Sequence, residues 1–305
     1  MFLAFPHSFS PAEYGQFMQK VLQLHYYITA SYLLLSYLSI VFVLPSLAAE
    51  RWRPYLLLLV PSMYMFSVYN WDVLAAALFV LSLYAFERGR HELSGTLAGL
   101  SVSTKLLTLF GGTLLALALL REGRRADFWR YSLAFVAAAA LPYLAVLLLS
   151  PHGFSRMISH HATWYCENCL YMLLSSDIWS STHRVLAALS IGFLAGSLLT
   201  LALLRRVDIR RAAFVSVSVP ITFNYVFTPQ MMAMLAPLAL LTLPLPLFLI
   251  YALADALNAA ALIVFFNEAN PWTLPSTTQK VFMGRNVIMA VLTLIVLASL
   301  FRRRG

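Results

Sequence analysis

The sequence contains little charge. Only 11% of its 305 residues are Asp, Glu, Lys or Arg, whereas 61% are hydrophobic, and the mean hydropathy is +0.79. Soluble domains carry roughly 25% charged residues, so this composition excludes that class. It predicts an all-α, polytopic bundle of transmembrane helices in the cell (plasma) membrane, because helices satisfy their own backbone hydrogen bonds in lipid.

Cysteine is also scarce. Cys166 and Cys169 are the only two cysteines, and a structural zinc site needs about four ligands, so one Cys-x-x-Cys pair does not complete it. A short-range disulfide and an ordinary pair of thiols are both compatible with this spacing. Residues 1–27 lack the basic start and apolar core of a cleavable signal peptide.

The basic residues are unevenly distributed. The chain has 21 Lys and Arg against 12 Asp and Glu, an excess that in a soluble protein would indicate a nucleic-acid partner. Here most of them form short clusters between apolar runs, which is typical of a positive-inside topology and predicts no nucleic-acid binding. The clusters are Arg51/Arg53, Arg88/Arg90, Arg121/Arg124/Arg125/Arg130, Arg205/Arg206/Arg210/Arg211 and Arg302/Arg303/Arg304.

The apolar runs between these clusters predict eleven spans in a single domain, with an external N-terminus and a cytoplasmic C-terminus. The second predicted span runs from Tyr55 to Tyr69, and the last runs from Asn286 to Phe301, after a second external loop from Asn267 to Arg285. The predicted sections are an external interfacial helix (1–27), N-terminal spans (28–149), an external loop (150–184) and C-terminal spans (185–301).

One segment is too short for two ordinary spans. Only 30 residues separate Arg90 from Arg121, although both ends are basic and two full spans need about 40 residues. We therefore expect two short helices that meet near Lys105, with Gly95 and Gly99 allowing close packing of the first and Gly111-Gly112 relaxing the second.

The predicted topology gathers sparse polar residues on the external side. Such a site suits a lipid-linked anionic substrate, whose apolar tail stays in the bilayer while cations hold its phosphate. Lys105, Arg156 and Arg285 are the candidate cations, and Asn70, Asp72, Glu167 and Gln230 are candidates for the sugar site. His160 or His161 would assist at the leaving group or the acceptor.

Simpler interpretations of these residues stay open. Lys105 could extend its ammonium to the membrane surface without binding anything. Asp72 could only cap the helix that follows it. His160 and His161 could be solvated residues of the external loop.

Six short stretches stand near the ends of predicted spans: Asn70-Trp71-Asp72, Glu87-Arg88-Gly89-Arg90, Ala98-Gly99-Leu100, Thr104-Lys105-Leu106, His160-His161-Ala162-Thr163-Trp164-Tyr165-Cys166-Glu167-Asn168 and Thr228-Pro229-Gln230. Together they resemble the multispanning glycosyltransferases of the GT-C superfamily. The likeness is closest to the polyprenol-phosphate-mannose-dependent mannosyltransferases of bacteria and archaea.

The resemblance implies an inverting transfer of a hexose, mannose in the first place, on the external face of the membrane. The donor would be a polyprenyl- or dolichyl-phosphate sugar, and the acceptor a glycolipid or glycan. A carboxylate would act as the general base and cations would stabilise the departing lipid phosphate. No cofactor is required, and a divalent metal is optional.

The chain departs from the family pattern at its start. In these enzymes the base is usually an Asp in the first external loop, after an initial span, whereas no acidic residue precedes Glu13 here. The span from Ile28 to Ala49 corresponds to the second one of the family. We therefore hypothesise that the chain starts within that loop, being truncated, mis-started or completed by a second polypeptide.

Three functional interpretations follow. Glu13 or Asp72 could replace the absent base of a glycosyltransferase. The chain could instead be a non-catalytic partner subunit of such an enzyme. A transporter or flippase for a lipid-linked or anionic solute is the third, and Asp255 is the clearest polar residue within a predicted span that would favour it.

Overall fold

The computed structural model describes the backbone of residues 11–302 and the side chains of residues 14–302. Within residues 11–302 all regular elements are helices, and the only pairing of extended residues is an isolated bridge between Glu167 and Val226. Five described helices are long and apolar enough to cross a membrane: Tyr14–Leu47 within α1, α6 (Arg125–Leu149), α8 (Ser181–Leu204), α11 (Leu245–Phe265) and α12 (Thr277–Phe301). The predicted helical membrane protein is thus confirmed.

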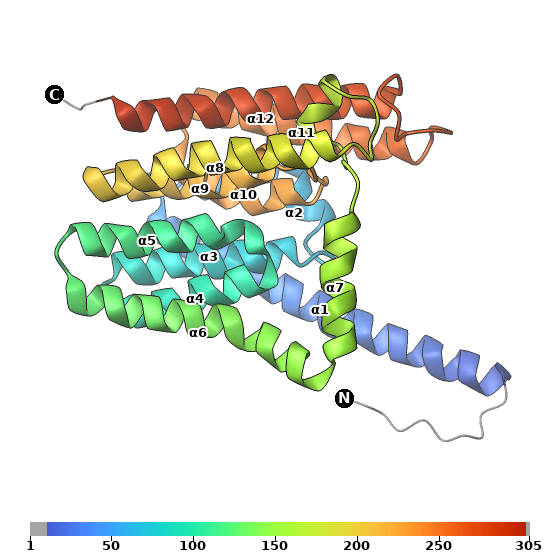
Figure 1. Ribbon diagram of the computed structural model, residues 1–305, viewed down its shortest axis with the longest axis horizontal. Coiled ribbons are helices and arrows are strands. Elements are labelled where there is room, and N and C mark those ends of the chain that lie inside the picture. Colours follow the sequence, from blue (N-terminus) through green and yellow to red (C-terminus); the bar gives the residue numbers. More distant parts are fainter. Residues whose placement is uncertain (1–10, 303–305) are drawn as a thin grey trace.

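Shorter helices complete the bundle: α3 (Asp72–Glu87), α4 (His91–Thr104), α5 (Leu109–Arg121), α9 (Ile209–Thr222) and α10 (Met231–Thr242). Most of them lie side by side with the longer helices (Figure 1). Every residue of α10, and every residue of α9 from Ala212 onward, is buried. Helices that are apolar on all sides belong in the centre of a bundle, so α9 and α10 form its core.

The two short helices expected around Lys105 are present. Helix α4 ends at Thr104 because Lys105 is extended, and a 3-10 turn, η2 (Leu106–Thr108), leads into α5. Gly95 and Gly99 do allow close packing, since a β-carbon at either would overlap a backbone carbonyl of α6.

Gly111 and Gly112 have a different role from the one predicted. A β-carbon at Gly111 would overlap the ring of Phe79, and one at Gly112 would overlap the ring of Phe135. These two glycines therefore make room for aromatic rings and do not relax the helix.

Two segments near the N-terminus differ from the prediction. Helix α1 (Pro11–Leu47) is continuous, where a separate interfacial helix and a span were expected. The run from Tyr55 to Tyr69 forms a 3-10 helix, η1 (Arg53–Leu59), and a five-residue helix, α2 (Pro61–Met65). Pro61 explains the break between η1 and α2, because a proline disfavours helical backbone in the residue before it, and Val60 is extended.

The segment 150–184 is more ordered than a loop. It contains helix α7 (Pro151–Thr163) and a 3-10 turn, η3 (Leu170–Leu173). Helix α7 starts sharply because the Ser150 side chain accepts the N–H of Gly153 and Pro151 occupies its first turn. Figure 1 shows α7 lying across one end of the bundle, while the other helices run along it.

The bundle has two chemically different ends. We call the end where α3, α5, α8 and α12 finish the basic end, because Arg88, Arg121, Arg205 and Arg302 lie there (Figure 1). We call the opposite end, where α3 begins and α7 lies, the cavity end.

Candidate functional site

A cavity of about 470 Å³ lies at the cavity end. It is formed by the α4–η2 junction, the end of α7, the segment after α7 and the start of α10. It brings together five of the predicted site residues: Lys105, His160, His161, Glu167 and Gln230. The exposed side chain of Leu106 and the half-buried Leu107 add an apolar border.

Lys105 is held in place by a buried carboxylate. Its ammonium lies 2.8 Å from Oδ1 of Asp72, and the two side chains are 27% and 0% exposed. Asp72 is itself positioned by Asn70, whose side-chain oxygen accepts the Asp72 N–H at 3.0 Å. The structure therefore places Lys105 in the cavity with a fixed partner and does not support the simple surface extension considered from the sequence.

Asp72 and Asn70 lie behind this lysine. Neither is among the residues that line the cavity. The geometry therefore gives them an indirect role, where direct contacts with substrate were predicted. Their hydrogen bond and ion pair fix the position of the Lys105 ammonium. Asp72 is the first residue of α3, where its negative charge also favours the helix dipole.

Glu167 is the carboxylate that lines the cavity. Its Oε2 accepts the indole N–H of Trp164 at 2.9 Å. Its backbone is fixed to the segment before α10, with Glu167 N–H donating to Tyr225 and Phe227 N–H donating to the Glu167 carbonyl. Burial raises the pKa of the Glu167 carboxyl, and the Trp164 hydrogen bond and the charge of Lys105 partly offset that rise.

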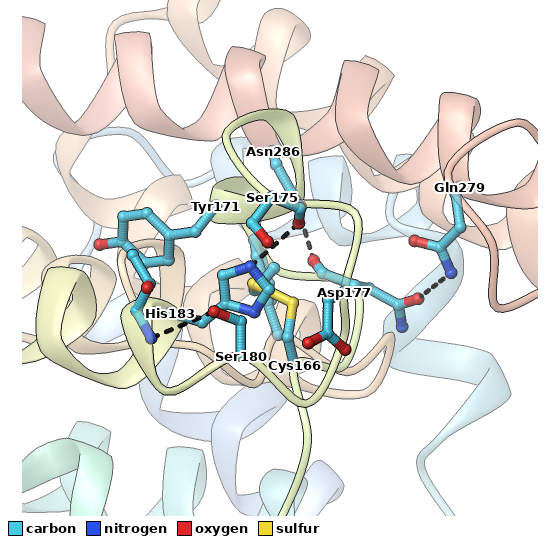
Figure 2. The surroundings of a disulfide bond; sticks show 12 residues. Cys166, Tyr171, Ser175, Asp177, Ser180, His183, Gln279 and Asn286 are labelled. Carbon is cyan, nitrogen blue, oxygen red and sulfur yellow. Dashed lines mark hydrogen bonds between the residues drawn. A yellow bond between two sulfur atoms is a disulfide. The ribbon is translucent and has the colours of Figure 1, made fainter.

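The backbone next to Glu167 is strained and strongly constrained. Asn168 has a φ of 51°, in the left-handed region that non-glycine residues rarely occupy. Its carbonyl accepts the Asn286 amide and its side-chain oxygen accepts the Gln279 amide; both donors are labelled in Figure 2. Strain held by several independent contacts is common at functional sites, where it fixes a reacting group.

The two cysteines form a disulfide at this position, which decides between the two interpretations of the Cys-x-x-Cys pair. The bond connects the residues on either side of Glu167 and Asn168 (Figure 2). Among the described residues, the one metal-like group is Cys166, Cys169 and His183, with potential ligand atoms within 4.8 Å of one another. Because the disulfide uses both sulfurs, this group does not fit a metal in the observed state.

The two histidines occupy the last turn of α7 and are solvent-exposed. The His160 ring packs edge-on against Trp164 with a centroid separation of 4.4 Å. The carbonyl of His161 accepts the Tyr225 hydroxyl at 3.1 Å. They are thus helical residues at the rim of the cavity, where a loop was expected.

Two further predicted residues, Arg156 and Arg285, are not among the described residues that line the cavity. Arg156 is exposed on α7, one turn before His160. The side chain of Glu13 lies outside the described residues. Arg285 was predicted in an external loop to hold phosphate, but α12 begins eight residues earlier and the Arg285 side chain is 0% exposed.

Arg285 is instead part of a buried network. It donates to the side-chain oxygens of Asn258 (2.5 Å) and Asn286 (2.9 Å) and to the Phe227 carbonyl (2.8 Å). Its guanidinium also stacks on the rings of Phe227 and Phe282. Phe227 and Asn286 both hydrogen-bond to the backbone of residues 167 and 168. Arg285 therefore stabilises the site through its contacts with these two residues.

Trp164 and Arg184 also belong to the site, although neither was predicted from the sequence. Trp164 donates to Glu167, and the i, i+3 spacing of an indole donor and a carboxylate is the signal that could have found it. Arg184 donates to the Trp164 carbonyl at 2.8 Å and lies 5.7 Å from the Tyr225 ring centroid. The sequence signal that could have found Arg184 is its position apart from the basic clusters.

The family model of glycosyltransferase family 87 matches residues 2–223, more than two thirds of the chain. The chain belongs to glycosyltransferase family 87. This is a GT-C-type family, so the predicted superfamily is confirmed and the protein is a membrane glycosyltransferase with a sugar donor and an acceptor. The matched region includes Lys105, both histidines and Glu167. No curated protein matches the chain, and no solved structure matches it.

Proposed function

We propose that this family 87 protein transfers a hexose, with mannose as the first candidate, from a polyprenyl- or dolichyl-phosphate donor to a glycolipid or glycan, with inversion. The observation that carries the proposal is the half-buried Lys105 ammonium in a cavity bordered by Leu106 and Leu107. This combination suits a ligand with a phosphate next to an apolar chain.

The proposal places the basic end in the cytoplasm and the cavity on the external face of the plasma membrane. Arginines at the ends of α5, α8 and α12 favour this orientation through the positive-inside rule. The Cys166–Cys169 disulfide beside the cavity also supports it, because disulfides persist in oxidising compartments.

In this mechanism the Lys105 ammonium stabilises the negative charge that develops on the leaving phosphate. Asp72 fixes the position of this ammonium, which lies 2.8 Å from the Asp72 Oδ1 atom. His160 and His161, at the rim, assist at the leaving group or the acceptor, and Gln230 contributes an amide to the sugar site. Arg156, on the exposed face of α7, contacts the membrane surface or the phosphate as the donor enters.

Transport is less well supported. The polar residue that favoured it, Asp255, is 0% exposed and accepts the N–H of Ser62 at 2.8 Å. Together with the buried hydrogen bonds of Arg285, this indicates a packed network that joins α2, α11 and α12, not a path for solute.

The decisive experiment is a transfer assay in membranes with radiolabelled polyprenyl-phosphate mannose. Replacing Lys105 alone would leave Asp72 as an unpaired buried carboxylate, so the test variant is the double mutant Lys105→Ala/Asp72→Asn. We expect transfer to fall by about 100-fold or more, because a preorganised charge is removed from the leaving group.

Lys280→Ala is the matched control, since Lys280 is an exposed lysine at the start of α12. It should transfer at the wild-type rate. Wild-type transfer by the double mutant would remove Lys105 from the phosphate role, and failure of the unmodified protein to use any polyprenyl-phosphate hexose would overturn the donor class itself.

A further inference from the structure

A second, smaller cavity of about 170 Å³ lies next to the first. Five aromatic residues from four segments of the chain line it: Phe66, Tyr69, Phe265, Trp272 and Phe282. Glu167 and Gln230 line both cavities, so these two residues stand between the two spaces. The proposed donor site leaves this second cavity without a role.

We infer that the second cavity is the acceptor subsite, that it takes a saccharide ring, and that Glu167 is the general base acting between acceptor and donor. The inference rests on the proposed function, because it needs a sugar donor in the first cavity.

The chemistry of the lining favours an uncharged saccharide. None of the described residues that line the second cavity is a Lys, Arg or His, so it offers no cation for a phosphate. Its volume is well below the roughly 300–1,000 Å³ typical of sites for drug-sized ligands, so it suits one ring. Aromatic faces pack against the C–H face of a sugar, while the Gln230 amide and the Glu167 carboxylate can bond its hydroxyls.

A row of aromatic rings connects the two cavities. The Trp164 and Tyr165 rings are stacked with centroids 5.8 Å apart, and Tyr165 meets Trp272 edge-on at 5.8 Å. Trp272 in turn meets Phe265 at 4.9 Å. The wall of the acceptor subsite thus packs, through Tyr165, against Trp164, which holds Glu167.

Glu167 is oriented for proton transfer. The Trp164 indole occupies Oε2, and Oε1 has no hydrogen-bond partner in the described part of the chain. The disulfide, the Asn168 contacts and the two backbone hydrogen bonds with Tyr225 and Phe227 fix the backbone that carries this carboxylate. Preorganisation of this kind places a base within reach of a substrate hydroxyl.

The proposed transfer moves one proton to Glu167 and exchanges one bond at the anomeric carbon of the donor sugar. Oε1 of Glu167 takes the proton of an acceptor hydroxyl, and that hydroxyl oxygen forms a bond to the anomeric carbon of the donor sugar. The bond from the anomeric carbon to the phosphate oxygen breaks, and its electron pair stays on the polyprenyl phosphate beside Lys105. The products are the glycosylated acceptor, a protonated Glu167 and the lipid phosphate dianion.

Binding can be tested apart from transfer. The protein in lipid nanodiscs is titrated with methyl glycosides of mannose, glucose and galactose, and separately with polyprenyl phosphate. We expect saturable binding of at least one glycoside, weakened about tenfold by Trp272→Ala, with polyprenyl phosphate binding unchanged. Tyr69→Ala, at a side chain 53% exposed, should act in the same direction without opening the core.

The matched control is Trp129→Ala, since Trp129 is a 61% exposed indole on α6 near the basic end. It should bind glycosides like the wild type. If glycosides do not bind, or bind equally well to the Trp272 and Tyr69 variants, the acceptor subsite is overturned. If the unmodified protein does not bind polyprenyl phosphate, the proposed donor is overturned instead.

The base is tested by Glu167→Gln, which keeps the shape of the side chain. We expect the transfer rate constant to fall about 10²–10⁴-fold while polyprenyl phosphate binding persists. Asp177→Asn is the control, because Asp177 is an exposed carboxylate in the same segment and should leave transfer unchanged. Transfer by Glu167→Gln within a few-fold of wild type would show that Glu167 is not the base.

Discussion

At the basic end, the guanidinium of Arg210 donates to both oxygens of Glu87 at 2.6 and 2.7 Å, and the two side chains are 34% and 30% exposed. At the cavity end, the ammonium of Lys105 faces Asp72, which is 0% exposed. The first pair is well formed but solvated, so it contributes little stability. The second has a carboxylate that would be costly without its cation, which fixes the lysine in the cavity.

The largest effect should come from breaking the buried support of the cavity end. Arg285→Leu removes three hydrogen-bond donors from Asn258, Asn286 and the Phe227 carbonyl and leaves those oxygens buried. We expect a loss of about 3–5 kcal/mol in the free energy of unfolding, measured by chemical denaturation in detergent.

Transfer should fall together with stability in Arg285→Leu, because Phe227 and Asn286 hold the backbone around Glu167. Arg302→Leu, an exposed arginine at the basic end, is the control and should change neither quantity. Equal unfolding curves for Arg285→Leu and the wild type would show that the network does not support the cavity end.

The next effect concerns the disulfide. Removing Cys166–Cys169 by the double mutant to Ser should cost about 2 kcal/mol, a small value because the loop that it closes is short. Transfer should fall further than stability explains, since the bond flanks Glu167, while binding of polyprenyl phosphate at Lys105 should persist. Parallel loss of both functions would indicate general unfolding of the cavity end.

The sequence was sufficient to locate Lys105 but not to explain Arg285. Two basic clusters 30 residues apart force a turn between them, and the turn falls at Lys105 in the structure. Hydropathy ended the last span near Asn286, so Arg285 was assigned to a loop, whereas α12 continues to Thr277. Two of the three oxygens that accept from Arg285 come from residues 27 and 58 positions away, and their proximity is set by helix packing.

The same reasoning applies to the second cavity. Its aromatic residues come from the segment before α3, the end of α11, the α11–α12 loop and α12, and none of these segments carries a motif by itself. Glu167 was predicted as a site residue from its polar surroundings, but its position between two cavities depends on pairing with the segment before α10.

The third effect is a pH dependence that should be specific to the cavity end. Because burial raises the pKa of Glu167, the acidic limb of the transfer profile should lie above the usual carboxyl range. Below that pKa the base is protonated, so kcat/KM should fall tenfold per pH unit. The limb should persist in His160→Gln and His161→Gln and disappear from the residual activity of Glu167→Gln.

The smallest effect is expected at the basic end. Glu87→Gln removes the ion pair with Arg210, which lies partly in solvent, so the unfolding free energy should fall by only about 0.2–1 kcal/mol and less at high salt. Transfer should stay at the wild-type level, whereas Asp72→Asn should lower transfer because the Lys105 ammonium loses its fixed partner. If Glu87→Gln lowered transfer as much as Asp72→Asn does, the two ends would not differ in function. The buried ion pair of Asp72 with Lys105 would then not distinguish the functional site from the basic end.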